Sequence, residues 1–264
     1  MKKTIISCVL FLTAVTAFSQ TPMKTAAEAK LSASDLAVKI ADRILATTTY
    51  EFKNTKTGKT YKSVKNLPLD MNVKVACKYN NWHYTNGVTH IALMELADKT
   101  GAKKYDDYVL KNMNFVFNEG NLDFFKKQYD QAMKNEGWYG VRKLSWHMIF
   151  RGKRLDDNGP MGASLIDLQM KHPNNSFLNY INETAEHLNY GEPRLADGTI
   201  ARIWPHENTI WADDAFMAIS FLARMAKMTG DMSYINDAAN QVIKYHKYLW
   251  CPEKRILYHC YHTD

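Results

Sequence analysis

The chain has 264 residues, 46% of them hydrophobic, and its formal net charge is +7. This length and apolar content predict a globular protein with one large core, and four cysteines are too few for a scaffold built on disulfides. The basic residues form no block along the chain, so the charge favours acidic ligands only weakly and indicates no nucleic-acid partner.

The first 20 residues predict a cleavable signal peptide. Two lysines precede an apolar run over residues 4–18, and Ala17-Phe18-Ser19 supplies a cleavage signal with small residues at both ends. The run is too short to span a membrane, and Cys8 lies inside it, whereas a lipid-anchored protein would carry a cysteine at its end. We therefore expect an exported protein, periplasmic or secreted and without a membrane anchor, whose residues 21–264 form a single domain with a formal charge of +5.

Hydrophobic residues recur every three or four positions through most of the remaining chain, a period typical of amphipathic helices. In chain order, helices are predicted over residues 35–48, 82–99, 105–117, 124–134, 161–170, 177–188, 211–228 and 234–249. Residues 60–64 and 72–78 are short strand candidates, and no longer stretch alternates with a period of two. The sequence therefore predicts an all-α fold.

The predicted helices repeat as hairpins. An offset of 129 residues places Trp82 on Trp211 and Gly101 on Gly230, and each glycine is predicted to end the first helix of a pair. Such pairs must stack on neighbours, because one hairpin alone leaves apolar surface exposed. Closed toroids of six hairpins and open solenoids have the same local pattern, so periodicity alone leaves both architectures open.

A second offset, of 56 residues, places a third hairpin between these two and superposes Asp157 on Asp213. Each of these residues belongs to an acidic pair near the start of a helix, Asp156-Asp157 and Asp213-Asp214. One Asp of such a pair commonly caps the helix N-terminus while the other interacts with the helix dipole. The same pair in two repeats instead favours carboxyl groups that face one ligand, with Tyr84 at the equivalent position of the first hairpin.

A general acid that works near neutral pH needs a raised pKa, which burial or a second carboxylate can provide. Trp211 lies two residues before Asp213 and could supply the apolar wall, with Asp157 as the second carboxylate. Aromatic residues near the acids could stack on sugar rings, although ordinary core packing is the alternative. Arg202 could bind a substrate carboxylate or pair with an acid of the protein itself.

The sequence contains no metal or cofactor motif that we recognise. Cys251, His259, Cys260 and His262 could ligate zinc, but their spacing matches no standard zinc motif. A disulfide between the two cysteines is favoured over a metal site, and a cavity-lining role is favoured for His259. The motifs of nucleotide-binding loops, serine hydrolase elbows and zinc peptidases are absent from the sequence, so no cofactor is expected.

Several of these segments together resemble glycoside hydrolase family 105, the unsaturated rhamnogalacturonyl hydrolases, and the related family 88, the unsaturated glucuronyl hydrolases. The resemblance spans most of the chain after residue 20 and is carried by residues 82–87, 155–162, 197–214 and 257–259. Its most specific part is Trp211-Ala212-Asp213-Asp214, which follows Asp197-Gly198-Thr199.

This resemblance implies an (α/α)6 toroid and an unusual reaction. The substrate is an oligosaccharide of the rhamnogalacturonan or pectin type, on which a polysaccharide lyase has left a 4,5-unsaturated uronic acid at the non-reducing end. By the same resemblance, Asp213 protonates C4 and assists the addition of water at C5, and Asp157 is the second acid, with Asp156 beside it. The positions that match cavity-lining residues of the family are Trp211, Tyr84 and His259. No metal is needed for this chemistry.

The resemblance also implies that the toroid is incomplete in this chain. Six hairpins at the 56-residue spacing need about 336 residues, and about 244 remain after the signal peptide. The family carries an Arg and a Trp that hold the uronate beyond the point that matches His259, so a C-terminal part is expected to be missing. Residues 135–153 have no partner in the repeats and resemble an insertion.

Two other functions stay open on the sequence. An inverting (α/α)6 glycoside hydrolase that acts on saturated glycans would use the same acidic pairs. A non-enzymic periplasmic scaffold would need the helical repeats but no paired acids. The sequence predicts no particular oligomeric state.

Overall fold

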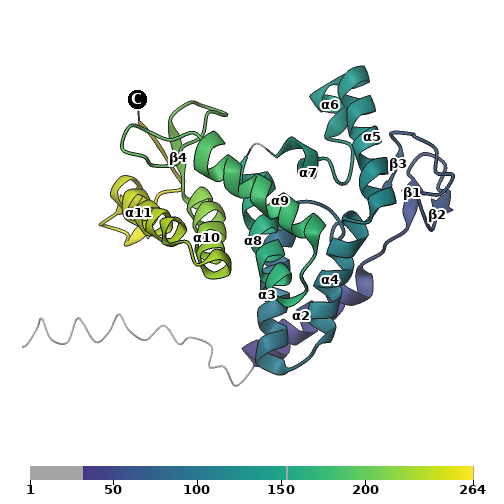
Figure 1. Cartoon of the computed structure of the whole chain (residues 1–264), viewed down its shortest axis with the longest axis horizontal. Helices are drawn as coiled ribbons and strands as arrows, with labels where there is room; N and C mark the ends of the chain where they lie inside the picture. The colour runs from purple at the N-terminus through teal and green to yellow at the C-terminus, as the bar shows by residue number, and fades with distance from the viewer. Residues whose placement is uncertain (1–31, 153, 264) are drawn as a thin grey trace, which may run out of the picture. The chain divides into compact units, whose positions relative to one another are not determined.

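The computed structural model describes residues 32–152 and 154–263, so the predicted signal peptide lies outside the described residues. The described residues are mostly helical (Figure 1). The chain divides into two compact units, Met1–Arg43 and Ile44–Asp264. No helix within the described part of the chain is long and apolar enough to cross a membrane.

Helix α2 (Ala33–Thr47) contains most of the described residues of the first unit. Its start is capped reciprocally, because the amide of Asp35 donates to Ser32 Oγ at 3.1 Å and the amide of Ser32 donates to Asp35 Oδ2 at 3.2 Å. This arrangement satisfies two amides that the helix itself leaves unpaired. The helix predicted over residues 35–48 is confirmed.

The second unit is built from helical hairpins, as the repeats predicted. The pairs are α3 (Tyr84–Thr100) with α4 (Lys104–Val116), α8 (Leu155–Lys171) with α9 (Asn175–Glu186), and α10 (Ala212–Thr229) with α11 (Met232–Leu249). Gly101 and Gly230 end α3 and α10 with φ values of 71° and 75°, a left-handed conformation that glycine adopts without a steric cost. Each glycine amide donates to the carbonyl four residues earlier, which closes the helix and starts the short turn.

Between the first and second hairpins lie α5 (Glu119–Glu136), α6 (Trp138–Val141) and α7 (Met148–Arg151). Helix α5 contains the predicted helix over residues 124–134 and is longer at both ends. The two short helices fall in residues 135–153, the segment that has no partner in the sequence repeats. Helix α7 ends at Arg151, four positions before α8 begins at Leu155, so this insertion lies close to the candidate site.

Helix α8 packs against both α3 and α10, so the first helices of the three hairpins form one layer. The backbones come close at Gly87, which faces Pro160, and at Gly159, which faces Met217. Most side chains of α8 are therefore buried, including the fully buried Leu165. This layer brings the N-terminal ends of α8 and α10 to the candidate site.

Small antiparallel sheets accompany the helices. Strand β1 (Phe52–Asn54) lies between β2 (Thr60–Tyr61) and β3 (Val73–Val75), strand β4 (Thr209–Trp211) pairs with β7 (Cys260–His262), and β5 (Trp250–Cys251) pairs with β6 (Ile256–Leu257). The two predicted strand segments contain β2 and β3. In the β4–β7 pair, Trp211 lies opposite Cys260, and the amide of Ala212 donates to the carbonyl of His259 at 2.8 Å.

The disulfide between Cys251 and Cys260, which the sequence favoured only over a metal site, is not formed, and both cysteines are free thiols. They belong to separate sheets, Cys251 to β5 and Cys260 to β7. The buried Cys251 thiol instead donates to the carboxylate of Glu253 at a sulfur–oxygen distance of 3.3 Å.

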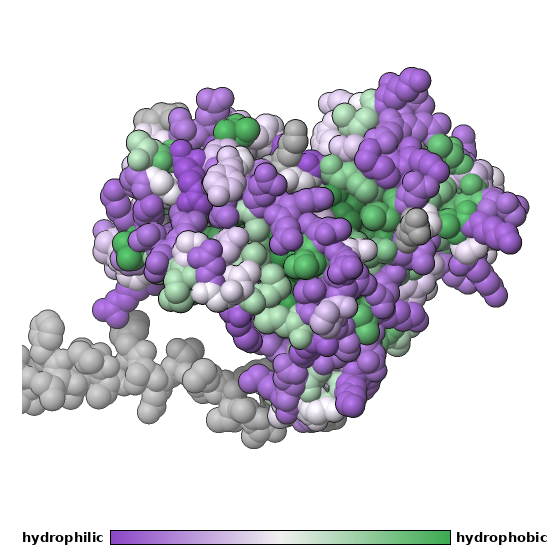
Figure 2. All heavy atoms as spheres, viewed as in Figure 1, coloured by the Kyte–Doolittle hydropathy of each residue, from purple (hydrophilic) through white to green (hydrophobic). Residues whose placement is uncertain are grey.

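The core of the described residues is apolar and rich in aromatic side chains. The largest fully buried side chains include Trp82, Tyr105, Tyr245, Phe52, Phe177 and Phe221. The molecular face in Figure 2 is covered mainly by hydrophilic residues, with separate hydrophobic areas between them.

Candidate active site

The two acidic pairs lie at the N-terminal ends of α8 and α10, and their members differ in burial. The second Asp of each pair is buried: Asp157 is 0% and Asp214 2% exposed. The first Asp of each pair is more open, with exposed side-chain fractions of 26% for Asp156 and 44% for Asp213. Consecutive side chains on a helix point about 100° apart, so one member of a pair can enter the core while the other faces outward.

An arginine binds each buried carboxylate. Arg202 donates from Nε to Asp214 Oδ2 at 2.6 Å and from Nη2 to Asp214 Oδ1 at 2.7 Å. Arg151, the last residue of α7, donates from Nε and Nη2 to the two carboxylate oxygens of Asp157. A buried carboxylate needs such a partner, because an unpaired charge in the protein interior is costly.

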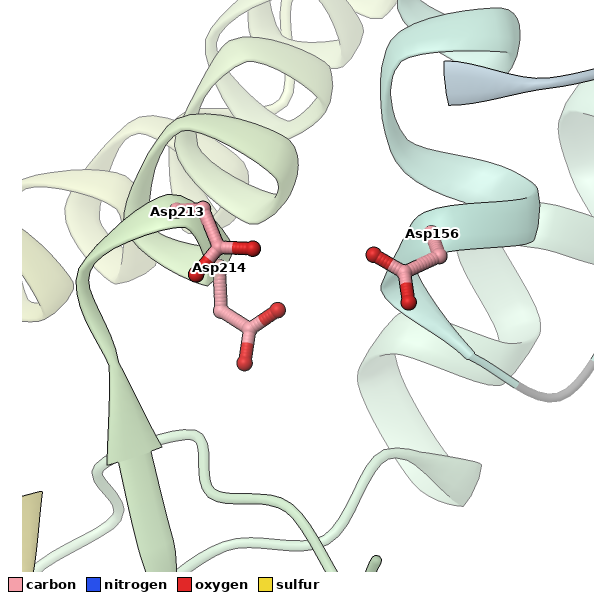
Figure 3. Close-up of side chains that lie close together, drawn as sticks. All are labelled: Asp156, Asp213 and Asp214. Carbon is pink, nitrogen blue, oxygen red and sulfur yellow. The ribbon is translucent and has the colours of Figure 1, made fainter. Parts of the chain in front are cut away.

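Three carboxylates gather around Arg202. Its Nη2 also lies 3.3 Å from Asp213 Oδ2 and 3.6 Å from Asp156 Oδ1. One oxygen from each of Asp156, Asp213 and Asp214 lies within 4.8 Å of the other two. Figure 3 shows Asp156 extending from α8 toward the aspartates of α10. The structure therefore joins Asp156 of the first pair to both members of the second pair in one cluster.

The same three oxygens could ligate a divalent cation, which prefers carboxylate oxygens. In this structure, however, the guanidinium of Arg202 already supplies a positive charge to all three carboxylates. It binds Asp214 through both oxygens, so ligation by Asp214 would require that ion pair to open. The cluster is thus a set of acids organised by an arginine of the chain itself.

Burial changes the ionisation of the inner acids. It raises the pKa of Asp214 to about 6, against the opposing effect of Arg202. Burial likewise raises the pKa of Asp157, against its hydrogen bonds with Arg151. Both of these carboxylates are bound by arginines, whereas Asp213 and Asp156 are the more exposed acids of the cluster.

Trp211 and His259 surround Asp213. The Arg202 guanidinium lies over the Trp211 ring at 4.5 Å, and the His259 ring meets that indole edge-on at 5.0 Å. His259 Nε2 is 4.0 Å from Asp213 Oδ1. The structure thus brings together Asp213, Arg202, Trp211 and His259, which the sequence singled out separately.

A cavity of about 550 Å³ opens beside the acid cluster. Its walls come from the junction of α7 and α8, from the π-helical turn η2 (His187–Gly191) that follows α9, and from residues 202–204. Its ionisable lining residues are Arg151, Arg154, Asp156, His187, Glu192, Arg202 and Asp214. This volume lies in the range of small-molecule binding sites.

Comparison with known proteins agrees with this geometry. Residues 56–264 match the sequence model of Glycosyl Hydrolase Family 88. The chain belongs to this family. The predicted resemblance to families 88 and 105 is thereby confirmed, while no curated protein matches the sequence significantly.

Solved structures similar to this family 88 protein are helical toroid enzymes. They include a possible member of family 105 from Salmonella enterica (TM-score 0.56, 15% identity, 89% of this chain and 53% of that chain covered) and a family 105 glycoside hydrolase from C. acetobutylicum (0.51, 21%, 75% and 46%). An inactive variant of an α-1,6-mannanase from Salegentibacter is also similar (0.53, 13%, 88% and 57%). These matches establish the (α/α) toroid class, and the chain spans about half the length of the family 105 structures.

The structure of this family 88 protein places Asp156, and not Asp157, beside Asp213. The sequence offset of 56 paired Asp157 with Asp213, whereas the cluster pairs Asp156 with Asp213, an offset of 57. Asp157 is held in the interior by Arg151, and its own carbonyl accepts a hydrogen bond from Trp82 Nε1 at 2.8 Å. The reason lies in α7, which supplies Arg151 and which no sequence repeat predicted.

Tyr84 lies at the start of α3, as predicted, and its ring packs against His83 at 4.5 Å. His83 interacts electrostatically with the acid cluster. Burial lowers the pKa of His83, and the negative charge of Asp156 opposes this effect. Tyr84 is not among the residues that line the cavity, and neither are Asp213, Trp211 and His259. Tyr84 is thus the first residue of α3, as the repeat predicted, and its contact with substrate stays a prediction.

Several residues at the cavity were not singled out from the sequence as site residues. Arg151 and Arg154 flank the start of α8, and His187 Nε2 lies 2.8 Å from Glu192 Oε2 across the turn η2. Among these residues, only Arg154 could have been identified as a site residue from the sequence, because it directly precedes residues 155–162, which resemble the family. A π-helical turn has no comparable sequence signal, although such turns are frequent at functional sites.

Proposed function

We propose that this family 88 protein is a glycoside hydrolase that removes a 4,5-unsaturated uronic acid from lyase-generated oligosaccharides of the rhamnogalacturonan or pectin type. The observation that carries the proposal is the carboxylate cluster: Asp156 and Asp214 line a cavity of about 550 Å³, and an oxygen of the exposed Asp213 lies within 4.8 Å of an oxygen of each. Family membership supports the glycosidase class. The unsaturated substrate rests on the resemblance of the motifs around Asp213.

The reaction assigned to this site is hydration of the double bond. The carboxyl group of Asp213 donates a proton to C4, and the π electron pair of the C4–C5 double bond forms the new C4–H bond, which leaves a single bond between C4 and C5. Positive charge develops at C5 and on the ring oxygen, where the carboxylate of Asp156 stabilises it. Water then adds to C5 and returns a proton to Asp213. The resulting hemiketal opens by cleavage of the bond between C5 and the ring oxygen, which gives a ketone at C5 and a hemiacetal at C1. Collapse of this hemiacetal to an aldehyde breaks the C1–O bond and releases the neighbouring sugar as an alcohol.

Arg202 has a positioning role in this proposal. Nε and Nη2 of this arginine donate to Asp214, and Nη2 also contacts Asp213 and Asp156. These N–H groups are therefore already used within the protein and are not free to bind a substrate carboxylate. Trp211 and His259 lie beside Asp213 and are proposed to contact the sugar ring, with Tyr84 as a further proposed contact.

The test is an absorbance assay with an unsaturated disaccharide made by a pectate lyase. Hydration removes the conjugation between the double bond and the carboxylate, so the ultraviolet absorbance should fall when the protein is added. Asp213→Asn should abolish the decrease, and the exposed Asp130→Asn is a matched control that should leave it unchanged. Constant absorbance with folded wild-type protein at high concentration would refute the proposal.

A second candidate is inverting hydrolysis of a saturated glycan. The α-1,6-mannanase of the same fold, in which a variant lacking two adjacent aspartates is inactive, supports glycoside hydrolysis at such a pair but does not indicate inversion. Asp213-Asp214 is also an adjacent pair at this site. Release of reducing sugar from saturated oligosaccharides, with no change for unsaturated ones, would favour this candidate. A non-enzymic scaffold would show neither reaction.

Export remains part of the proposal, because the predicted signal peptide lies outside the described residues. Expression in a bacterial host followed by N-terminal sequencing of the periplasmic protein tests it. Cleavage near residue 20 is the expected result, and recovery of the intact N-terminus from the cytoplasm would contradict it.

A further inference from the structure

The charged side chains that line the cavity are paired within the protein, with one exception. The pairs are Arg151 with Asp157, Arg202 with Asp214 and Asp156, and His187 with Glu192. Arg154 has no ion pair or side-chain hydrogen bond with another described residue. The cavity therefore contains one positive charge that the described part of the chain does not neutralise directly.

Arg154 lies at the N-cap of α8, two residues before Asp156. Its guanidinium carbon lies 4.7 Å from the centre of the Trp204 ring, and this indole is 60% exposed and lines the same cavity. Partial burial lowers the pKa of Arg154, and the positive charge of Arg151 acts in the same direction, against the opposing charges of Asp157 and Asp156. An anion in the cavity would relieve this unfavourable electrostatic environment.

We propose that Arg154 and Trp204 form a subsite for an acidic sugar, in which the guanidinium binds the sugar carboxylate and the indole stacks on the ring. Arginine matches the planar geometry of a carboxylate with two parallel hydrogen bonds. An exposed indole offers a flat apolar surface on which a sugar ring can stack. The cation–π contact with Arg154 holds the Trp204 ring next to the guanidinium.

This subsite rests on the proposed function and narrows its substrate. Because Arg154 precedes Asp156 by two residues, a sugar held there lies next to the ring attacked at the acid cluster. The neighbouring sugar is then itself acidic. Among oligosaccharides of the pectin type, those with consecutive uronic acids fit the cavity better than those in which the neighbour is a neutral sugar.

Calorimetric titration of the full chain with digalacturonate, compared with its dimethyl ester, tests the subsite. The ester has the same rings without the charge, so the unsubstituted protein should bind the acid at least tenfold more tightly. Arg154→Met should remove this preference while leaving binding of the ester within twofold. Trp204→Ala should weaken binding of both compounds.

Arg142→Met is the matched control, because Arg142 is exposed and is not among the residues that line the cavity. This variant should keep the preference of the unsubstituted protein. If Arg154→Met does not fold, Arg154→Lys carries the test: it keeps a positive charge but loses the planar pair of donors, and its preference for the acid should fall at least threefold.

Equal binding of acid and ester by the unsubstituted protein would overturn the subsite, as would a folded Arg154→Met that keeps the preference. Digalacturonate has no double bond, so its binding does not depend on hydration. Constant absorbance with the unsaturated substrate, together with an intact Arg154 effect, would refute the proposed reaction alone. Hydration without an Arg154 effect would refute the subsite alone.

Discussion

Arg202 and Asp214 form a two-point ion pair, with hydrogen bonds of 2.6 and 2.7 Å, although the Asp214 side chain is only 2% exposed. The same guanidinium contacts Asp213 and Asp156 and lies over the ring of Trp211. One arginine thus connects the two halves of the acid cluster, and its loss should affect both stability and activity.

Arg202→Met should lower the free energy of unfolding by about 3 kcal/mol at pH 7, because it leaves a buried carboxylate without its partner. Urea unfolding measures this loss. The double variant Arg202→Met with Asp214→Leu should recover part of it, since the uncompensated charge is then absent. A loss below about 0.5 kcal/mol in the single variant would show that Asp214 does not depend on this arginine.

Substitution of Asp156 should mainly lower activity, and substitution of Asp157 should mainly lower stability. Asp156→Asn should lower kcat by roughly tenfold or more, because a carboxylate beside the developing positive charge is lost, with little change in stability at this partly exposed position. Asp157→Asn should instead lower the free energy of unfolding by about 3 kcal/mol, since it removes the partner of Arg151. Unsaturated-substrate kinetics and urea unfolding measure the two effects, and the reverse pattern would return the catalytic role to Asp157.

Gly87→Ala should destabilise the contact between α3 and α8 strongly. A Cβ atom at this position would lie 2.3 Å from the carbonyl carbon of Pro160 and 2.5 Å from the amide nitrogen of Met161, so the backbone would have to move. We expect a loss of about 3 kcal/mol or more in the free energy of unfolding. Gly120→Ala in α5 is the control, because its nearest atom would be Val64 Cγ2 at 3.4 Å. A similar loss in both variants would contradict the proposed close approach.

His90 should make stability depend on pH. It is buried in α3, neither ring nitrogen has a hydrogen-bond partner among the described residues, and burial lowers its pKa to about 4. In the unfolded chain, this histidine is protonated with its ordinary pKa of about 6.5. Burial of the neutral ring therefore costs no stability above this pH, and the free energy of unfolding decreases as the pH falls from about 6.5 toward 4.

Between about pH 6.5 and pH 4, His90 should lower the free energy of unfolding by about 1.4 kcal/mol for each unit by which the pH falls. His90→Leu should remove this contribution, which urea unfolding at pH 7, 6, 5 and 4 measures as a shallower profile than that of the unsubstituted protein. His246→Leu is a control at an exposed histidine. Identical profiles for His90→Leu and the unsubstituted protein would contradict the prediction.

Local patterns in the sequence were sufficient for the helices and their pairing. Apolar spacing located α3 and α10 within a few residues, and Gly101 and Gly230 ended them because only the left-handed conformation closes such a turn cheaply. The repeat also brought attention to both acidic pairs. These features depend on residues near one another in the chain, which is why they could be predicted.

The choice of which acid faces the site depended on contacts that no local pattern contains. Asp156 and Asp157 have the same chemistry, and the helix only ensures that they point in different directions. Arg151 decided the outcome, because it comes from an inserted helix and draws Asp157 into the interior. Likewise, Trp204 was visible in the sequence as an aromatic residue, but its contact with Arg154 across the cavity arises from the path of a loop.

The sequence by itself determined an all-α chain of hairpins with acids at the helix starts, because helix period, glycine caps and residue chemistry are local properties. Only the tertiary structure decided that Asp156 joins Asp213 and Asp214 around Arg202, and that Arg154 stays unpaired in the cavity. The physical reason is that burial and ion pairing depend on packing between segments far apart in the chain, and these select one carboxylate of each pair for the interior and leave the other for a ligand.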